Sequence, residues 1–367
     1  MKCLLLLIVL ALCGCAGPQS TDQHGATVPE AMTALVKRHH VCAAAVAVIK
    51  HRRLEAIHFA SGCEPAPAVR ANSVFQAASL SKPVFAYAVL KLVAQGRMDL
   101  DASVMNYLPQ GYRHRANPLQ PAPADLVTDP QLSAVTVRMA LNHTSGLPNW
   151  SGGRLRVGAR PGSAFSYSGE GYVMLQRAVE AVTGQPLDVF MAAQVFKPLA
   201  MQHSSYVWTE QRAQGLLPGT KANGAARATM VMKEPVAAFS LYTSAADYAR
   251  FMTALLNDDR AIANIAGSPV AVDAQLGLFW GLGWGMEGGA SDATIWQWGN
   301  NPGYRAFAMA SLDTGDGFVM LTNSENGLAL AEPLAHTILL RDYKLFRSPI
   351  LGTDVFNMLC NGIRICL

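Results

Sequence analysis

A serine and a lysine stand three positions apart in the segment Ser79-Leu80-Ser81-Lys82. On a helix such residues share one face, with Cβ atoms about 5 to 6 Å apart, so the Lys82 amine can reach the Ser79 hydroxyl. A neutral lysine there can accept the hydroxyl proton and make the serine a nucleophile for acyl transfer. Pro83 is tolerated only in the first helical turn, so the helix must begin close to Ser79. Free N–H groups and the positive helix end then lie where an oxyanion would form.

A tyrosine in the segment Phe165-Ser166-Tyr167-Ser168-Gly169 is the second candidate. A tyrosine in a loop is most often a half-buried residue with only a packing role. Beside an activated serine, however, a tyrosinate held by nearby cations is a competent general base, and the phenol can return the proton to a leaving group. Tyr167 is therefore a candidate acid and base for the same reaction.

A third polar segment, Gln297-Trp298-Gly299-Asn300-Asn301-Pro302-Gly303-Tyr304, lies between two predicted strands. Glycine permits close approach of the backbone to a ligand, and exposed N–H groups here could complete an oxyanion site. Trp298, Gly299 and Asn300 are the candidate substrate-binding residues of this segment. Four tryptophans, at positions 280, 284, 296 and 298, could line a substrate cleft, although core packing explains the first two at least as well.

The elements that must position these residues follow from apolar pattern and turn residues. Two short strands are predicted early, at 43–49 and 54–60, and three late, at 294–298, 306–311 and 318–321. They predict a five-stranded antiparallel sheet built from both chain ends, with a mostly helical region inserted at about 97–240. Helices are predicted at 84–95, 171–182, 244–256 and 329–340, the last packing on the sheet. The fold class is α/β of the α+β type.

Composition narrows the class of protein. Apolar residues make up 51% of the 367 residues and charged residues 15%, which excludes a disordered or highly charged scaffold protein. The net charge is +4 and no run of five Lys or Arg occurs, so the basic footprint of a nucleic-acid binder is missing. Organised by pattern, one domain is expected over 28–345, followed by a tail at 346–367.

The N-terminal segment has the pattern of a targeting signal. Lys2 precedes an apolar run from Leu4 to Leu12, which is too short for a bilayer that needs about twenty residues. The run ends in Leu12-Cys13-Gly14-Cys15, which resembles the lipobox of bacterial lipoproteins, in which the final cysteine is lipidated. We expect residues 1–15 to be this signal, Cys15 to carry the lipid, and the protein to be periplasmic. Outer-membrane delivery is implied by Ala16, and an ordinary secretory signal is the alternative.

Four further cysteines, Cys42, Cys63, Cys360 and Cys366, form an even number in what would be an oxidising compartment. One hypothesis pairs Cys42 with Cys63 and Cys360 with Cys366, and buried free thiols are the other. No Cys-x-x-Cys or Cys/His spacing typical of zinc occurs, so no metal site is predicted.

Several further segments follow the Ser79–Lys82 pair in a fixed order. They are Gly96-Arg97-Met98-Asp99-Leu100-Asp101, Val135 to Arg138, Leu141-Asn142-His143-Thr144-Ser145-Gly146-Leu147, Pro161-Gly162 before Tyr167-Ser168, and Gly281-Leu282-Gly283-Trp284-Gly285. Over about residues 30 to 340 the set resembles the serine β-lactamase-related hydrolase family, which holds class C β-lactamases, D-alanyl-D-alanine peptidases and esterases. The resemblance implies a β-lactamase/transpeptidase-like fold and no cofactor. It also implies Ser79 as the acylated nucleophile, Lys82 as its partner and Tyr167 as acid and base.

The sequence departs from this family at two positions. The third motif, usually Lys or His before a small residue and Gly, falls on Gln297 to Gly299 or on Trp298 to Asn300, and neither alignment supplies a cation. Gly169 replaces the Asn that holds the substrate amide in relatives, and by this motif position Gly169 is a further candidate substrate-binding residue. An ester or another amide is therefore as plausible a substrate as a β-lactam.

Other catalytic patterns fit less well. The segment His143-Thr144-Ser145-Gly146 mimics a third motif but precedes Tyr167, so we interpret it as structural. No Gly-x-Ser-x-Gly elbow occurs, which removes the central feature of an α/β-hydrolase.

The leading hypothesis is a lipid-anchored serine hydrolase that forms an acyl-enzyme with a β-lactam, a D-alanyl peptide or an ester. The Ser79 N–H and one near Asn300 would hold the oxyanion. The expected partners are a small-molecule or peptidoglycan-derived substrate and a membrane, with neither nucleic acid nor an obligate protein partner. The alternative is a catalytically inactive ligand-binding or sensing lipoprotein of the same fold, which predicts binding without turnover.

Overall fold

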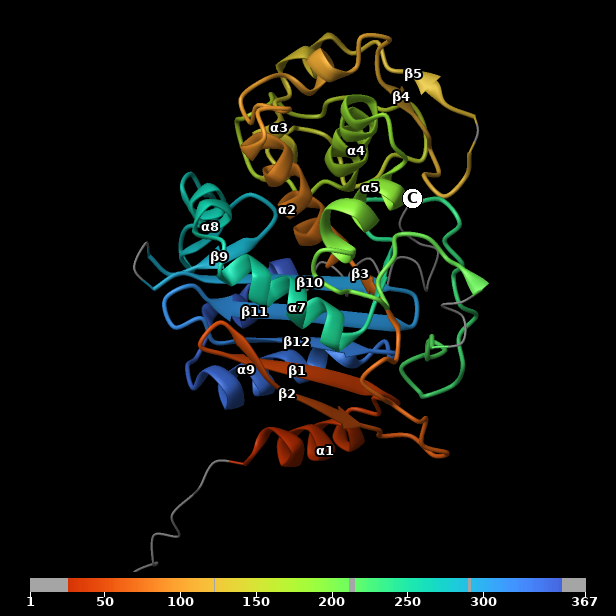
Figure 1. Ribbon diagram of the computed structural model, residues 1–367, viewed down its shortest axis with the longest axis vertical. Helices are drawn as coiled ribbons and strands as arrows, with labels where there is room; N and C mark the ends of the chain where they lie inside the picture. Colours follow the sequence, from red (N-terminus) through yellow and green to blue (C-terminus); the bar gives the residue numbers. More distant parts are fainter. Residues whose placement is uncertain (1–25, 122, 211–214, 290–291, 352–367) are drawn as a thin grey trace, which may run out of the picture.

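An eight-stranded sheet is the centre of the computed structural model, which describes residues 26–121, 123–210, 215–289 and 292–351 (Figure 1). The strand order is β2-β1-β12-β11-β10-β9-β8-β7, and all neighbours are antiparallel. The strands are β1 (Ala44–Lys50), β2 (Arg53–Ala60), β7 (Val270–Asp273), β8 (Leu278–Trp280), β9 (Gly285–Glu287), β10 (Thr294–Asn301), β11 (Tyr304–Ser311) and β12 (Gly317–Thr322). Ala44 pairs with Thr322, so the sheet joins both ends of the chain as predicted.

The sheet has eight strands rather than the five predicted. All five predicted strands are present, and β7, β8 and β9 extend the sheet beyond β10. These three strands have only three or four residues each, and Gly281, Gly283 and Gly285 interrupt the apolar pattern between them. Strands this short, with glycine in and between them, give too little alternation to predict from sequence.

Helices cover both faces of the sheet. Alternate residues of β1 face opposite ways, as the pleat requires. Ala45, Ala47 and Ile49 belong to the core that includes helices α2 (Ser81–Ala94) and α7 (Ala245–Leu256). Ala44, Val46 and Val48 pack in a second core with helices α1 (Val28–Arg38) and α9 (Ala331–Leu339). The sheet is thus the middle layer between two sets of helices, and α9 is the predicted helix on the sheet.

A mostly helical region lies above the sheet in Figure 1. Helix α2 is buried at eleven of its fourteen residues, which is typical of a helix surrounded by protein. The remaining elements are the helices α3 (Val137–Leu141), α4 (Gly169–Thr183), α5 (Leu187–Met191) and α8 (Asp259–Ala266), a π-helical turn (Ala192–Phe196), the paired strands β3 (Phe75–Ala78) and β6 (Leu241–Thr243), the paired strands β4 (Arg113–His114) and β5 (Asp125–Leu126), and the 3-10 helices Val104–Tyr107, Pro130–Ala134, Gly327–Leu330 and Lys344–Arg347.

Helix ends agree with the sequence signals. Ser244 caps α7 by accepting a hydrogen bond from the Asp247 N–H, and Gly184 ends α4 with a left-handed φ of 68°. The packed chain continues past the domain end expected at 345, because Phe346, Ile350 and Leu351 contact the core beside α1 and α9. The domain boundaries otherwise stay a prediction.

A disulfide joins Cys42 to Cys63, which confirms that half of the predicted pairing. Cys15, Cys360 and Cys366 lie outside the described residues.

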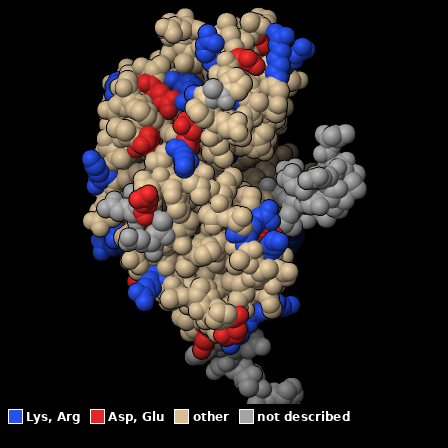
Figure 2. All heavy atoms as spheres, turned by 90° about the vertical axis from the view of Figure 1, so that its right-hand side faces the viewer, with Lys and Arg blue, Asp and Glu red and all other residues tan. Residues whose placement is uncertain are grey.

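Within the described ranges, none of the helices is long and apolar enough to cross a membrane. Figure 2 shows Lys, Arg, Asp and Glu side chains interspersed over one mostly uncharged face, in keeping with the low charged content of the sequence.

Candidate active site

Ser79 lies in the turn between β3 and α2, and Lys82 lies in the first turn of that helix. The Lys82 Nζ is 3.1 Å from the Ser79 Oγ and 2.9 Å from the carbonyl oxygen of Ala238. Lys82 is only 1% exposed, so its amine meets these groups away from bulk water. The helix begins at Ser81, which confirms the start expected from Pro83.

Neighbouring side chains fix the turn that presents Ser79. Ala78 has a φ of 49°, a left-handed conformation that is costly for a residue with a Cβ. The Ser81 hydroxyl donates to the Ala78 carbonyl at 2.6 Å and accepts from the Leu241 N–H at 2.9 Å. These bonds tie the turn to strand β6, so the strained backbone before the candidate nucleophile is held by its surroundings.

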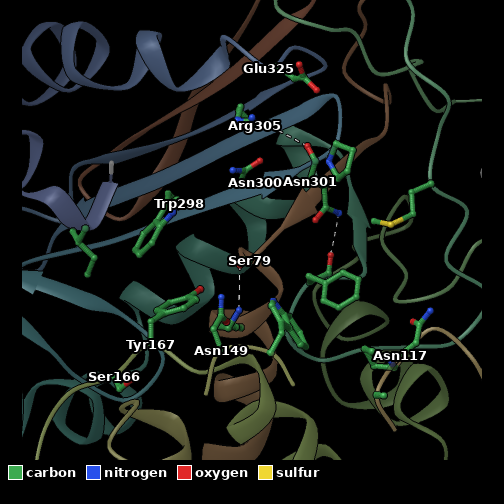
Figure 3. Close-up of a pocket in the computed structure, with 18 of the residues that line it drawn as sticks. Ser79, Asn117, Asn149, Ser166, Tyr167, Trp298, Asn300, Asn301, Arg305 and Glu325 are labelled. Atoms are coloured by element: carbon green, nitrogen blue, oxygen red, sulfur yellow. Dashed lines mark hydrogen bonds between the residues drawn. The ribbon is translucent and has the colours of Figure 1, made fainter. Parts of the chain in front are cut away.

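Tyr167 immediately precedes α4, which Ser168 caps by accepting from the Gly171 N–H at 2.9 Å. The ring of Tyr167 lies under the Lys82 amine, with 4.7 Å between Nζ and the ring centroid. The Tyr167 ring also contacts the rings of His143 and Trp298, with centroid distances of 4.3 and 5.2 Å. The structure therefore brings Ser79 and Lys82, from one segment of the chain, together with Tyr167 from a second segment. Figure 3 labels Ser79 and Tyr167.

His143 holds the segment that contains Tyr167 in place. Its Nδ1 accepts a hydrogen bond from the Ser168 N–H at 3.0 Å, and the ring is completely buried. Burial holds the pKa of His143 well below its usual value. A neutral His143 that accepts at Nδ1 agrees with its interpretation as a structural residue.

Gln297 takes the place of the missing cation. Its Nε2 donates to the Ser79 carbonyl and to the Tyr167 phenol oxygen, each at 3.2 Å. Of the two alignments left open by the sequence, the structure therefore favours Gln297 to Gly299, because Gln297 is the residue that contacts the serine and the tyrosine. The group beside the phenol is a neutral amide.

Strand β10 presents an edge to the site. Asn301 and Tyr304 flank a two-residue turn, so their backbone groups pair with each other across the hairpin. The backbone N–H of Asn300 must then point to the opposite edge. Strand β9 pairs with that edge only as far as Trp296, opposite Gly285. The Asn300 N–H thus lies on an edge that β9 leaves unpaired, in a residue that also lines the pocket, as an oxyanion donor would have to.

A pocket of ≈ 1290 Å³ opens beside Ser79. Many of its lining residues are aromatic or amide-bearing, and the lining is completed by two arginines and a glutamate: Ser79, Lys82, Ala116, Asn117, Pro118, Asn149, Trp150, Phe165, Ser166, Tyr167, Arg227, Met230, Phe239, Trp298, Asn300, Asn301, Pro302, Arg305, Glu325 and Ile350. Arg227 pairs with Glu325 at 2.6 Å, so these two opposite charges neutralise each other. Figure 3 shows Tyr167 and Trp298 on one side of Ser79 and Asn117 on the other.

Two residues predicted to bind substrate do not line this pocket. A Cβ on Gly299 would meet the carbonyl oxygen of Ala77, so this glycine permits close packing of β10 on β3. Gly169 is covered by the indole of Trp150. Trp298 and Asn300 do line the pocket. Of the other tryptophans considered, 280, 284 and 296 are core residues.

The pocket also contains residues that were not predicted from the sequence: Trp150, Phe239, Met230 and the Arg227–Glu325 pair. Trp150 alone carried a signal, since a tryptophan in a loop of Pro, Asn, Ser and Gly has little local packing to explain it. The others reach the pocket through long-range contacts that no local pattern encodes.

Comparison with known proteins agrees with this architecture. The family model described as "Beta-lactamase" matches residues 28–342. This chain belongs to the beta-lactamase family. The resemblance inferred from the sequence motifs is thereby confirmed, and so is the β-lactamase/transpeptidase-like fold.

Individual relatives of the family are distant. Esterase EstB of Burkholderia gladioli is 32% identical over 39% of this chain and 41% of its own length. Penicillin-binding protein 4* of Bacillus subtilis (strain 168) is 24% identical over 70% of this chain and 62% of its own length. The D-alanine carboxypeptidase AmpC from Burkholderia cenocepacia has a similar structure, with a TM-score of 0.68 and 18% identity, over 83% of this chain and 95% of that one. The chain thus spans less than two thirds of the two sequence relatives.

Proposed function

We propose that this chain is a serine hydrolase that cleaves carboxylic esters through an acyl-enzyme on Ser79. The observation that carries the proposal is the buried Lys82 amine 3.1 Å from the Ser79 hydroxyl, with the Tyr167 ring beside it. The family match and the esterase and penicillin-binding relatives support this class of enzyme.

The chemistry follows from these positions. The Ser79 Oγ attacks the ester carbonyl carbon while an unprotonated Lys82 takes the hydroxyl proton. The carbonyl oxygen becomes an oxyanion, held by the backbone N–H groups of Ser79 and Asn300. When the bond to the alcohol oxygen breaks, Tyr167 supplies the proton that this oxygen needs. Water then attacks the acyl-enzyme carbonyl carbon and gives a proton to the Tyr167 phenolate. As the bond to the Ser79 Oγ breaks, the protonated Lys82 returns its proton to that oxygen, and the carboxylic acid leaves.

Two features favour an ester over a peptide or a β-lactam. Gln297 places a neutral amide where a cation would attract a substrate carboxylate. The indole of Trp150 covers Gly169, where a side chain could otherwise hydrogen-bond a substrate amide. A neutral ester needs neither group.

The test compares turnover of p-nitrophenyl acetate, a penicillin and a D-alanyl-D-alanine peptide by the full chain. Ser79→Ala is expected to lower ester turnover by about a thousandfold or more, because the residual rate comes only from the surrounding site. Ser166→Ala is the matched control, since Ser166 lines the same pocket and is exposed. Unchanged ester turnover in Ser79→Ala would refute the proposal. Substrate binding without turnover by the parent chain would favour the inactive binding module.

We also propose that Cys15 carries a lipid that anchors the protein on the periplasmic side of a membrane. The apolar run before Cys15 supports this, and the Cys42–Cys63 disulfide is typical of an oxidising compartment. Labelled palmitate is expected in the parent chain and in Cys13→Ser but not in Cys15→Ser. Equal label in all three proteins would exclude Cys15 as the lipidated residue.

A further inference from the structure

The indole of Trp150 is 44% exposed in the pocket, yet its backbone is fixed on both sides. The carbonyl of Asn149 accepts from the N–H groups of Gly169 and Glu170, at 3.1 and 3.2 Å. The N–H of Ser151 donates to the Glu170 carboxylate at 2.9 Å. The loop is thereby tied to the first turn of α4 on each side of the tryptophan. An exposed aromatic side chain on a fixed backbone can bind a ligand with little loss of conformational entropy.

The indole also fills the space over Gly169, the first residue of α4. A Cβ on Gly169 would lie 2.6 Å from the Cζ2 and Cη2 atoms of Trp150 and 2.8 Å from the Asn149 carbonyl oxygen. No side chain fits at position 169 while the ring keeps this position. Because the indole covers Gly169, two residues after Tyr167, the surface there is flat and apolar.

The apolar surface continues onto Phe239. The rings of Trp150 and Phe239 meet edge to face, with centroids 5.4 Å apart and planes at 85°. Phe239 directly follows Ala238, whose carbonyl accepts from Lys82 at 2.9 Å. The Trp150–Phe239 wall, as we call this pair, therefore begins next to the reacting centre, and both rings line the pocket. Such a pair is typical of a site that binds a flat apolar group.

We propose that the Trp150–Phe239 wall binds the acyl group of the substrate and selects flat apolar acyl groups such as arylacetyl. This proposal rests on the proposed ester hydrolysis at Ser79. The proton for the leaving alcohol comes from Tyr167, whose ring packs against that of Trp298, so the alcohol belongs on the Tyr167–Trp298 side of Ser79 (Figure 3). The acyl group then extends along the Trp150–Phe239 wall.

The experiment measures kcat/KM of the full chain for p-nitrophenyl phenylacetate and p-nitrophenyl acetate, which share one leaving group. Trp150→Ala is expected to lower the phenylacetate-to-acetate ratio about tenfold, because an aromatic contact is lost for one acyl group only. Trp150→Phe is expected to restore most of the ratio. Gly169→Ala should also lower it, because the added Cβ meets both the indole and the Asn149 carbonyl that holds the loop and so displaces Trp150. Val189→Ala, an exposed apolar residue outside the pocket, should leave it unchanged.

Equal changes for both esters in Trp150→Ala would overturn the proposal. A second series keeps the acetyl group and varies the alcohol. The proposal would also be overturned if Trp150→Ala changed kcat/KM only with the alcohol portion of the ester. Labelling of Ser79 by a fluorophosphonate separates the two levels. Labelling without acyl selectivity refutes only the role of the wall, whereas a parent chain with neither labelling nor ester turnover refutes the proposed function and the wall with it.

Discussion

The side-chain amide nitrogen of Gln297 lies 3.2 Å from the phenol oxygen of Tyr167 and 3.2 Å from the carbonyl oxygen of Ser79. A carbonyl oxygen can only accept, which fixes the amide nitrogen on this side. The phenol oxygen accepts the second amide hydrogen, so the phenol hydrogen must point elsewhere. Gln297 thus orients Tyr167 without adding charge to the site.

Replacing Gln297 by lysine is expected to change substrate preference. A cation at this position attracts a substrate carboxylate, whereas the neutral amide does not. Gln297→Lys should raise kcat/KM for a penicillin relative to p-nitrophenyl acetate by about tenfold. Steady-state kinetics with both substrates checks this, and Gln297→Met controls for loss of the amide. An unchanged ratio in Gln297→Lys would show that this position does not select substrate charge.

Lys82→Met tests the proton acceptor. Methionine has a similar length and is apolar, so it fits the buried site while removing the amine. Ester turnover is expected to fall by about a hundredfold to ten-thousandfold, the range of general base catalysis. Lys91→Met on the same helix is the matched control. Turnover by Lys82→Met close to that of the control would rule out Lys82 as the base.

The buried His143 predicts a loss of stability in mild acid. The unfolded chain binds a proton at this histidine near pH 6.5, while the folded chain resists it because the pKa is lowered by burial. The free energy of unfolding should therefore fall as pH drops below about 6.5, with a limiting slope of about 1.4 kcal/mol per pH unit.

His143→Asn is the variant for this test, since asparagine keeps an acceptor for the Ser168 N–H and tolerates the φ of 60°. Urea unfolding between pH 7.5 and 5.5 should show a shallower decline in His143→Asn than in the parent chain. Parallel declines would mean that His143 contributes nothing to the pH dependence.

The Cys42–Cys63 disulfide closes a loop of 21 residues around the β1–β2 hairpin. Removing the bond by Cys42→Ala and Cys63→Ala together is expected to lower the free energy of unfolding by about 3 kcal/mol, chiefly because the unfolded chain gains conformational freedom. Urea unfolding of the double variant measures this loss. The reduced parent chain should show a similar loss. The expectation is contradicted if the double variant and the reduced parent chain each unfold with the same free energy as the oxidised parent chain.

The sequence predicted the parts of the fold and site that local chemistry determines. Ser79, Lys82 and Pro83 are close in sequence, so the short turn that leads into α2 brings the amine to the hydroxyl. Strand β1 and the late strands show the apolar runs of buried strands, and their pairing across the chain was correctly predicted.

Long-range packing could not be predicted from local sequence patterns. Trp150 and Gly169 stand nineteen positions apart in sequence, and only the folded loop places the indole over the glycine. Their motif positions predict that Gly169 and Gly299 bind substrate, whereas the structure shows that each permits a close approach from a neighbouring segment. A glycine in a motif does not reveal whether ligand or protein fills the adjacent space.

The central claim is that Ser79 is an activated nucleophile. The most direct measurement is the intact mass of the full chain after treatment with a fluorophosphonate and, separately, with a penicillin, followed by mapping of the modified peptide. We expect a fluorophosphonate adduct on Ser79, absent from Ser79→Ala and present in Ser166→Ala, with little or no stable penicillin adduct. A penicillin adduct on Ser79 would point to a penicillin-binding or β-lactamase activity instead of an esterase. A chain that neither reagent modifies would contradict the account.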